Sequence, residues 1–235
     1  MTEKKALVTG GTRGIGAAVA RALVECGHEV TVSGTSLEGH GPEGCAYLGC
    51  DFSDTSQLEA FAAQVAKMDL AVLVNNAGIN KVGPLADYDL EDFVRIQQIN
   101  LVAPFMLCRA VVPGMRRRRF GRIVNVTSIW SVVSKSGRAA YSASKCGLLG
   151  LSRALALEVA ADNVLVNCVA PGVVDTELTR RVLGETGIKE LLERIPIRRL
   201  AKPEEIARCV SFLASDANSY ITGQNIVIDG GFTCG

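Results

Sequence analysis

Residues 6–16 read ALVTGGTRGIG, and this stretch decides which fold the chain adopts. Its first residues have the apolar, β-branched character of a strand, and the spacing of apolar residues from Ile15 to Cys26 predicts an amphipathic helix. Gly10, Gly14 and Gly16 permit a tight turn and a close approach of other groups to the backbone. Because the first N–H groups of a helix have no partner within it, such a turn can hold a pyrophosphate. A purely structural strand-to-helix turn has the same pattern.

Strand-like and helix-like segments alternate along the rest of the chain. Further strands are expected at 29–33, 46–52, 70–75, 122–128, 164–170 and from 221, and helices at 56–67, 90–115, 141–158 and from 203. Successive strands connected by helices form parallel sheets with right-handed crossovers. We therefore predict an α/β fold over residues 1–235, a single-domain Rossmann-type doubly wound parallel sheet with helices on both faces.

Two segments interrupt the alternation. Residues 37–49 are rich in glycine and contain a proline, which predicts a loop or a short turn where a second crossover helix would usually lie. From about Thr179 to Ala201 the apolar periodicity weakens and the charge rises. This pattern is interpreted as a mobile lid over the site.

The composition excludes several classes of protein. Of 235 residues, 48% are hydrophobic and the formal net charge is +1, so no overall field attracts nucleic acid or an anionic membrane. No signal peptide is evident, and no apolar run approaches the roughly 20 residues of a membrane helix. The eight cysteines include no CxxC pair and are interpreted as reduced thiols of a cytoplasmic protein in preference to disulfides. No metal site is expected.

The stretch from Ser128 to Lys145, SIWSVVSKSGRAAYSASK, contains the candidate catalytic groups. Tyr141 and Lys145 are four residues apart and share one face of a helix. Ser128 ends a predicted strand, so its hydroxyl is expected at the carboxyl edge of the sheet, where ligands bind in open α/β folds. A nearby ammonium should lower the tyrosine pKa from about 10 toward neutrality and make Tyr141 a proton donor. A tyrosine and a lysine at this spacing are also common surface patterning.

The end of the second strand predicts the cofactor. In sites that choose NAD, an Asp or Glu near this position holds the ribose 2′-hydroxyl, whereas this chain has Ser33, Gly34, Thr35 and Ser36 there. No carboxylate would repel a 2′-phosphate, and Arg13 in the glycine turn carries the opposite charge. Both features favour NADP(H).

Polar residues and glycines follow the other predicted strands. The sequence Asn-Asn-Ala-Gly at 75–78 suits a close approach of backbone to a cofactor. Asp51, after the third strand, would reach the adenine or, alternatively, cap the helix at 56–67. The turn 171–176 follows the sixth strand, and its backbone and the Thr176 hydroxyl would reach a nicotinamide carboxamide.

Two features of the helix at 90–115 have alternative explanations. Asn100 is a poor residue for a helix interior, so it either faces water or has a function. The four arginines at 116–119 complement the dipole at the end of this helix, or else they dock an anion.

The motifs TGGTRGIG, NNAG, Asn100, Ser128, YSASK and PG-x-x-x-T occur in this order across essentially the whole chain. Through them the sequence closely resembles the short-chain dehydrogenase/reductase family, and it looks most like the 3-oxoacyl-[acyl-carrier-protein] reductases. The resemblance implies that Tyr141 is the general acid and that Ser128 hydrogen-bonds the substrate oxygen. It also implies that Lys145 lowers the pKa of Tyr141 and holds the nicotinamide ribose, while Asn100 anchors a water that relays protons to Lys145.

The motifs and the resemblance together define the expected site. The cofactor-binding residues are Gly10, Thr12, Arg13, Gly14, Ile15, Gly16, Thr35, Asp51, Phe52, Asn76, Ala77, Gly78, Tyr141, Lys145, Pro171, Gly172, Val174 and Thr176. The substrate residues are Ser128, Trp130, Arg138 and Tyr141. The resemblance also implies a homotetramer, in which small residues such as Ala154 and Ala156 allow close helix approach and the C-terminal strand forms a second contact.

Two departures from the carrier-protein reductases affect the expected substrate. Asp162 stands in the turn where they usually have a basic residue that helps to dock the acidic carrier. Trp130 and Arg138 replace small or amide residues, and Trp130 either fills space or narrows the pocket for a smaller or aromatic ketone.

Three functions therefore compete. The first is an NADPH-dependent 3-oxoacyl thioester reductase, as in fatty acid biosynthesis, with an acyl carrier protein as its candidate partner. The second is a reductase or dehydrogenase of another small ketone or alcohol, and the third is a non-catalytic dinucleotide-binding regulator. The intact set of Asn100, Ser128, Tyr141 and Lys145 argues against the third.

Overall fold

The structure, a computed structural model, describes residues 4–234, apart from the side chains of residues 178 and 181–183. Seven parallel strands form one sheet in the order β3-β2-β1-β4-β5-β6-β7. The strands are β1 (Lys4–Val8), β2 (His28–Gly34), β3 (Cys45–Gly49), β4 (Val72–Asn75), β5 (Gly121–Val126), β6 (Val164–Pro171) and β7 (Asn225–Ile228). The chain crosses from β3 back to the far side of β1 when it enters β4, which is the switch point of a doubly wound sheet.

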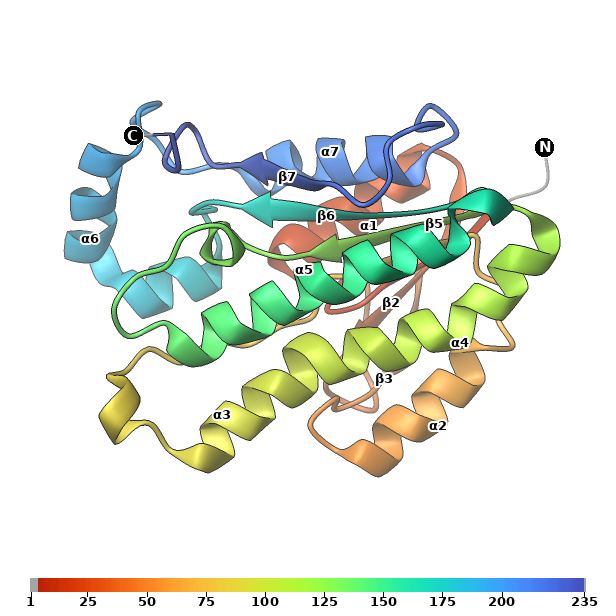
Figure 1. Cartoon of the computed structure of the whole chain (residues 1–235), viewed down its shortest axis with the longest axis horizontal. Coiled ribbons are helices and arrows are strands. Elements are labelled where there is room, and N and C mark those ends of the chain that lie inside the picture. Colours follow the sequence, from red (N-terminus) through yellow and green to blue (C-terminus); the bar gives the residue numbers. More distant parts are fainter. Residues whose placement is uncertain (1–3, 235) are drawn as a thin grey trace.

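Helices cover both faces of this sheet (Figure 1). The helices are α1 (Gly14–Glu25), α2 (Thr55–Val65), α3 (Leu90–Gln97), α4 (Ala103–Arg118), α5 (Ala139–Val159), α6 (Glu177–Arg194) and α7 (Pro203–Ala214). Helices α1 and α7 pack together on one face, and α2, α4 and α5 pack on the other. The predicted α/β fold is therefore confirmed.

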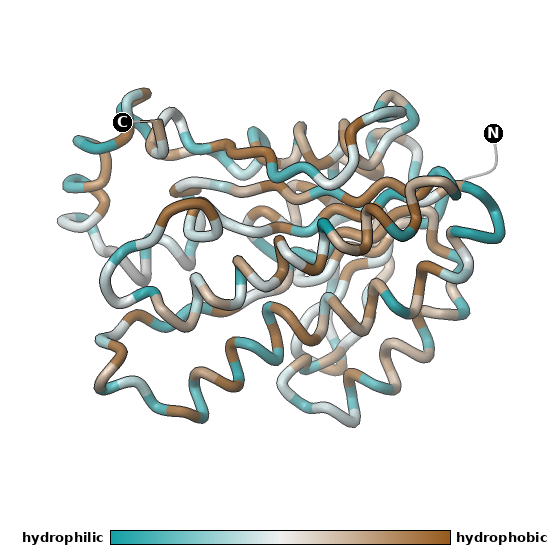
Figure 2. The backbone as a smooth tube through the Cα atoms, in the orientation of Figure 1, coloured by the Kyte–Doolittle hydropathy of each residue, from teal (hydrophilic) through white to brown (hydrophobic). Residues whose placement is uncertain are grey.

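Each face has its own apolar core. Leu23 of α1 and Val210 of α7 lie in the first, while Phe61 of α2 and Leu107 of α4 lie in the second. Every residue of β4, β5 and β6 is buried, as expected for strands covered on both faces. Figure 2 shows the hydrophobic residues concentrated along these central strands and hydrophilic residues at the turn that follows α4.

The prediction of one uninterrupted α-helix over 90–115 is wrong in its middle. A π-helical segment, Gln98–Val102, separates α3 from α4, and it contains the fully buried Asn100. The side chain of Asn100 points into the protein, so the alternative that it faces water is excluded. Widened helical turns of this kind frequently lie at functional sites.

The helical stretch Leu90–Arg118 contains an 18-residue window with a mean hydropathy of 1.2, so by length and composition alone it could cross a membrane. The window is not an unbroken apolar run, because polar residues such as Asn100 lie within it. Leu107, Val111 and Met115 are buried in the core against the sheet, and they identify this stretch as a core helix.

The segment from Thr179 to Ala201, expected to be a lid without regular periodicity, is largely helical. Helix α6 occupies 177–194, and its backbone breaks at Gly184, which has a φ of +62°. The apolar positions on either side of such a break follow two different helix phases, so no single period is visible in the sequence. Whether the segment moves stays a prediction.

Two assignments at helix ends also change. Asp54, not Asp51, caps α2, because its carboxylate accepts a hydrogen bond from the Gln57 N–H at 3.0 Å. Ala156, expected at an interface between helices, is 2% exposed and packs inside its own protomer.

Candidate active site

The glycine turn between β1 and α1 is built around three close approaches. Gly10 and Gly14 have φ values of +61° and +55°, which only glycine adopts without strain. A Cβ at Gly16 would lie 2.3 Å from the Gly10 carbonyl oxygen and 2.5 Å from Nδ2 of Asn76. A side chain would be strained by the positive φ at Gly10 and Gly14 and has no room at Gly16, so the turn carries no side chain at these three positions.

The segment after β4 is fixed to this turn by hydrogen bonds. Asn76 Nδ2 donates to the carbonyl oxygens of Thr9 at 2.9 Å and Gly10 at 3.1 Å. The Thr9 hydroxyl accepts from the N–H groups of Asn76 and Ala77, both at 3.0 Å. A Cβ at Gly78 would lie 3.2 Å from Oδ1 of Asn100 and 3.5 Å from Nζ of Lys145. Two segments that are 60 residues apart in sequence therefore form one continuous backbone surface beside Lys145.

The expected catalytic residues meet at this edge. Lys145 is 3% exposed, donates to the Val126 carbonyl oxygen at 2.8 Å, and has its Nζ 5.6 Å from the centre of the Tyr141 ring. The Ser144 hydroxyl donates to the Tyr141 carbonyl oxygen and accepts from Asn100 Nδ2 at 3.0 Å, which joins the π-helical segment to α5. Ser128 follows β5 and is 7% exposed.

The 2′-phosphate side of the expected cofactor site differs from the prediction at Ser33. This residue is 2% exposed, and its hydroxyl accepts from the Gly10 N–H at 3.2 Å, so it supports the glycine turn and is not available to a ligand. Thr12, Arg13 and Thr35 are exposed. Arg13 forms no ion pair with Glu38 or with any other side chain that the structure describes.

Several of the remaining expected cofactor residues form contacts within the protein. Asp51 accepts hydrogen bonds from the Ser53 N–H and hydroxyl at 2.9 and 2.7 Å, and the ring of Phe52 packs against Phe61 in the core, so at Phe52 only the backbone is open to a ligand. Thr176 caps α6, and its methyl carbon would be 3.5 Å from a Cβ on Gly14, which places it beside the glycine turn.

The others follow the backbone of the same edge. Pro171 ends β6, the Gly172 N–H donates to Ile228, Val174 is buried and pairs with Ala201, and Ile15 packs on the core.

The substrate side contains two residues that sequence analysis did not find, Phe232 and Arg194. The ring of Trp130 packs edge-on against Phe232, with centroids 6.0 Å apart, and the Arg138 guanidinium lies 5.7 Å from the Trp130 ring centre. The Arg194 guanidinium lies 5.1 Å from the centre of the Phe232 ring. The only sequence signal for Phe232 is its place just after the last strand.

Known proteins share both the sequence and this geometry. Residues 10–233 match the family described as enoyl-(acyl carrier protein) reductase. The chain is 40% identical to a 3-oxoacyl-[acyl-carrier-protein] reductase, FabG, of Rickettsia bellii, over 98% of this chain and 97% of the relative.

Solved structures agree. A structure from Beutenbergia cavernae, assigned as an NAD(P)-dependent gluconate 5-dehydrogenase with bound NADP, superposes with a TM-score of 0.92 at 35% identity and covers 99% of this chain and 97% of its own. A 3-oxoacyl-(acyl-carrier-protein) reductase of Agrobacterium tumefaciens with NADP bound gives a TM-score of 0.89 at 31% identity, covering 97% and 93%.

This chain belongs to the short-chain dehydrogenase/reductase family. It is an oxidoreductase, as its sequence predicts, and the enzyme class is confirmed. The described residues also fit the nicotinamide dinucleotide expected of the family, because Gly14 and Gly78 present backbone without a Cβ at this edge, one beside Thr176 and the other beside Asn100 and Lys145. Lys145 and the turn at 171–176 border the same edge.

Burial sets the protonation of the two central groups. It raises the pKa of the Tyr141 phenol, while the Ser128 hydroxyl and the Arg138 guanidinium act in the opposite direction. Burial also lowers the pKa of Lys145 to about 8. The net direction of the Tyr141 pKa is thus upward, because desolvation of the phenolate outweighs the Ser128 hydrogen bond and the charge of Arg138. That Lys145 lowers this pKa stays a prediction. At neutral pH Tyr141 is a protonated donor beside a charged lysine.

Proposed function

We propose that this enzyme reduces a ketone to a secondary alcohol with NADPH, and that a 3-oxoacyl thioester is its first candidate substrate. The observation that carries the proposal is the convergence of Ser128, Tyr141 and Lys145 at the carboxyl edge of the sheet. NADP bound to two structural neighbours and the FabG relative support the choice of cofactor and substrate.

In this mechanism the chain's residues orient the ketone and supply its proton. The bound cofactor supplies a hydride. The Ser128 hydroxyl donates a hydrogen bond to the carbonyl oxygen, and Tyr141, which burial keeps protonated, gives its proton to that oxygen as negative charge develops. Lys145 provides the positive charge that stabilises the phenolate left on Tyr141.

Asn100 is suited to the proton relay that the family resemblance implies. Both hydrogens of Nδ2 are used by Ile79 and Ser144, and Oδ1 accepts one hydrogen bond, from the Ile79 N–H. One lone pair of Oδ1 is left, and Oδ1 and the Lys145 Nζ both border the side-chain-free space at Gly78. A water there would contact both groups.

A turnover screen with NADPH tests the proposal, using acetoacetyl thioesters, diketones, cyclic ketones and sugars. Tyr141→Phe keeps the shape of the side chain and removes the proton, so we expect turnover to fall by about three orders of magnitude. NADPH binding, followed by cofactor fluorescence, should be largely kept. Near-normal turnover by the Phe variant would refute the assignment.

A second candidate, reduction of a small ketone that no carrier delivers, is favoured by the surface around Asp162. Its carboxylate accepts a hydrogen bond from Arg116 Nε at 2.6 Å and lies 3.9 Å from Arg119. These arginines are thus partly neutralised within the protein, and less of their charge is available to an acidic carrier. The charge reversal Arg119→Glu decides between the candidates: a raised KM for acetoacetyl carrier protein alone favours the carrier, and an equal effect on an acetoacetyl thioester of N-acetylcysteamine favours the small ketone.

We also propose a cytoplasmic homotetramer. The exposed Ala154 of α5 and the 48% exposed Phe105 of α4 supply an uncovered surface on the two helices that the family resemblance assigns to the contact. Light scattering at micromolar concentration tests this, and a monomeric mass would contradict it.

A further inference from the structure

Arg138 stands out among the arginines because it is half-buried and yet its charge has no partner among the described residues. Six arginines have a carboxylate within 4.0 Å: Arg21, Arg116, Arg118, Arg119, Arg180 and Arg199. The buried Arg122 is held by four backbone carbonyl oxygens. Arg138 is half-buried, and its guanidinium forms no ion pair or hydrogen bond with the part of the chain that the structure describes. A cation removed from water without compensation is costly, so this one is suited to a ligand.

The surroundings of Arg138 form a defined wall. Its guanidinium lies over the ring of Trp130, which packs against Phe232, and Arg194 of α6 lies over the other aromatic ring. We call these four side chains the arginine–aromatic row. Arg194 is exposed and also lacks a carboxylate partner among the described side chains. The row thus carries two positive charges and no negative one.

The row lies next to the reacting groups. Trp130 comes two residues after Ser128, and the backbone N–H of Trp130 donates to the Ser128 hydroxyl at 3.3 Å. Arg138 immediately precedes α5 and is three residues before Tyr141, and burial lowers the pKa of its guanidinium while Tyr141 acts in the opposite direction. The positive charge of Arg138 therefore stands within electrostatic reach of Tyr141, the proposed proton donor.

We propose that Arg138 binds a carboxylate of the substrate, so that the preferred substrate is a keto acid whose carboxylate lies a few bonds from the reducible carbonyl. A carboxylate is favoured because its planar pair of oxygens matches the fork of one guanidinium, and because it brings the single negative charge that one half-buried arginine can neutralise. A neutral 3-oxoacyl thioester leaves Arg138 unpaired. This inference rests on the proposed ketone reduction and names its substrate class.

Matched substrates and variants test the inference by kinetics. Acetoacetate and methyl acetoacetate share the same ketone and differ in charge. For Arg138→Gln we expect the KM of acetoacetate to rise about tenfold to a hundredfold, with the KM of methyl acetoacetate changed less than about threefold. Arg138→Lys should recover part of the difference, since it restores the charge without the fork. Arg117→Gln, which makes the same change in net charge in the last turn of α4, should leave both substrates unaffected. Equal effects of Arg138→Gln on the acid and the ester would overturn the inference, because they would mean that Arg138 acts on Tyr141.

Direct binding separates this inference from the proposed reaction. Trp130 is the only tryptophan of the chain, so intrinsic fluorescence reports on the row itself. With saturating NADP⁺, acetoacetate should change the emission saturably in the wild type and not in Arg138→Gln, and methyl acetoacetate should do so in neither. If no ketone is turned over and this acetoacetate response persists, the proposed function fails and carboxylate binding stands. Tyr141-dependent turnover of ketones without an Arg138-dependent response to acetoacetate would sustain the reaction and reject the carboxylate.

Discussion

The carboxamide of Asn100 pairs with both backbone polar groups of Ile79. The Ile79 N–H donates to Oδ1 and Nδ2 donates to the Ile79 carbonyl oxygen, each at 2.9 Å. This reciprocal pair fixes the segment after β4 against the π-helical turn, and thereby sets the position of Gly78 beside Lys145. The residue that the family resemblance assigns to a proton relay is therefore also a structural one.

Replacing Asn100 with Ala should lower both stability and cofactor affinity. The change leaves the N–H and carbonyl of Ile79 without their side-chain partner and removes the hydrogen bond that the Ser144 hydroxyl accepts, so we expect the free energy of unfolding to fall by about 2 to 4 kcal/mol. NADPH should also bind more weakly, because the 75–78 segment loses its anchor. Urea unfolding at pH 7 and cofactor titration measure the two effects.

Asn80→Ala provides the control, since the Asn80 Oδ1 is buried without a hydrogen-bond partner in the described structure. Its unfolding free energy should change by less than about 1 kcal/mol. An equal loss in both variants would show that the Asn100–Ile79 pair is not the cause.

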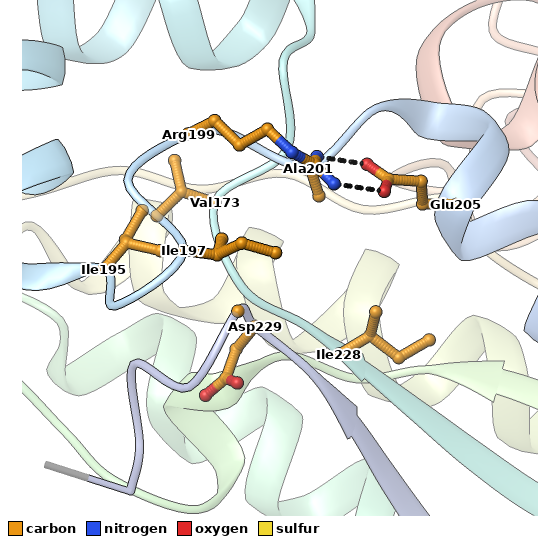
Figure 3. Close-up of a pocket in the computed structure, with 9 residues that line it drawn as sticks. Val173, Ile195, Ile197, Arg199, Ala201, Glu205, Ile228 and Asp229 are labelled. Carbon is orange, nitrogen blue, oxygen red and sulfur yellow. Dashed lines mark hydrogen bonds and ion pairs between the residues drawn. The ribbon is translucent and has the colours of Figure 1, made fainter.

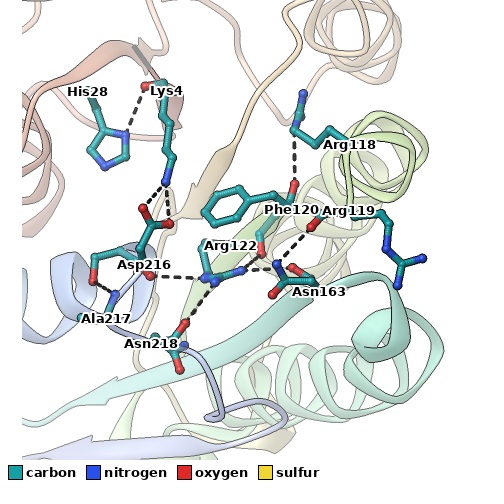
Figure 4. A network of polar contacts seen from close by, with 12 residues as sticks. Lys4, His28, Arg118, Arg119, Phe120, Arg122, Asn163, Asp216, Ala217 and Asn218 are labelled. Carbon is teal, nitrogen blue, oxygen red and sulfur yellow. Dashed lines mark hydrogen bonds and ion pairs between the residues drawn. The ribbon is translucent and has the colours of Figure 1, made fainter. Parts of the chain in front are cut away.

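Arg122 joins several segments at the opposite, amino edge of the sheet (Figure 4). It is 3% exposed, and its guanidinium donates to four backbone carbonyl oxygens: those of Gly121, Asn163, Ser215 and Asn218. It also stacks on Phe120, with 4.3 Å from Cζ to the ring centre. Arg122→Met keeps the approximate length of the side chain and removes its four hydrogen bonds to these carbonyls, so we expect a loss of about 2 to 4 kcal/mol of unfolding free energy.

Turnover should be unchanged in folded Arg122→Met at 25 °C, because the network lies away from Tyr141. Thermal and urea unfolding measure the loss, and Arg122→Lys should lie between the two, since an ammonium has three donors. A turnover defect that exceeds the unfolded fraction would contradict a purely structural role.

The sequence predicts those parts of the molecule that local pattern determines. The strand, glycine turn and helix at 6–26 form as expected because β periodicity, glycine and helix periodicity follow one another directly. Ser128 lies at the carboxyl edge of the sheet because it follows β5, and Tyr141 lies there because it stands in the first turn of α5. Capping at Asp54 is also local, but two acids three residues apart compete for it, and only the geometry decides.

The missed features are contacts between distant residues. Phe232, after β7, packs against Trp130, after β5, and the pairing of Arg116 with Asp162 joins α4 to the turn after α5. Neither contact leaves a periodic signal. Ser33 was expected at the ribose because the end of its strand faces the ligand, yet its hydroxyl turns to Gly10. The pocket of about 150 Å³ in Figure 3 is likewise formed by distant segments, because residues 195–201 after α6 and Glu205 of α7 line it together with Val173 and the end of β7. None of the expected catalytic residues lines it.

Lys145 is predicted to lower the free energy of unfolding, although the proposed reaction needs it. The difference between an ordinary lysine pKa of 10.5 and a value of about 8 corresponds to about 3 kcal/mol of unfavourable burial of the ammonium. Lys145→Met removes this cost but leaves the Val126 carbonyl unpaired, so we expect a net gain of about 1 to 2 kcal/mol at pH 7 together with loss of turnover. Urea unfolding measures the gain, and a variant less stable than the wild type would contradict it.

The pH dependence of that gain has a definite sign. Below pH 8 the folded and unfolded chains both hold the Lys145 proton, so the full cost is present. Between about 8 and 10.5 the unfolded chain holds more protons, and the wild type therefore gains stability as the pH rises. The difference between Lys145→Met and the wild type should accordingly shrink from pH 7 to pH 9.5. A constant difference would mean that Lys145 is not buried as a cation.

Arg13 is predicted to make the enzyme prefer NADPH over NADH. Its backbone is extended at the start of α1, its side chain is exposed, and no described carboxylate pairs with it, so its charge is available to a 2′-phosphate. The Ser33 hydroxyl is hydrogen-bonded to Gly10, so the exposed Thr35 is left as a hydroxyl donor nearby. We therefore expect Arg13 to supply more of the preference for NADPH. A charge-assisted contact to phosphate gives a preference of about tenfold to a hundredfold in kcat/KM.

Arg13→Ala should lose most of this preference and leave NADH turnover unchanged, because only the 2′-phosphate distinguishes the two cofactors. Arg21→Ala is a matched control on the same helix, where Arg21 lies 4.0 Å from Glu204, and it should keep the wild-type ratio. Steady-state kinetics with both cofactors decides the matter. Equal efficiency of the wild type with NADPH and NADH, or a preference for NADH, would refute the predicted cofactor, while an unchanged ratio in Arg13→Ala would assign the preference to the donors at the end of β2.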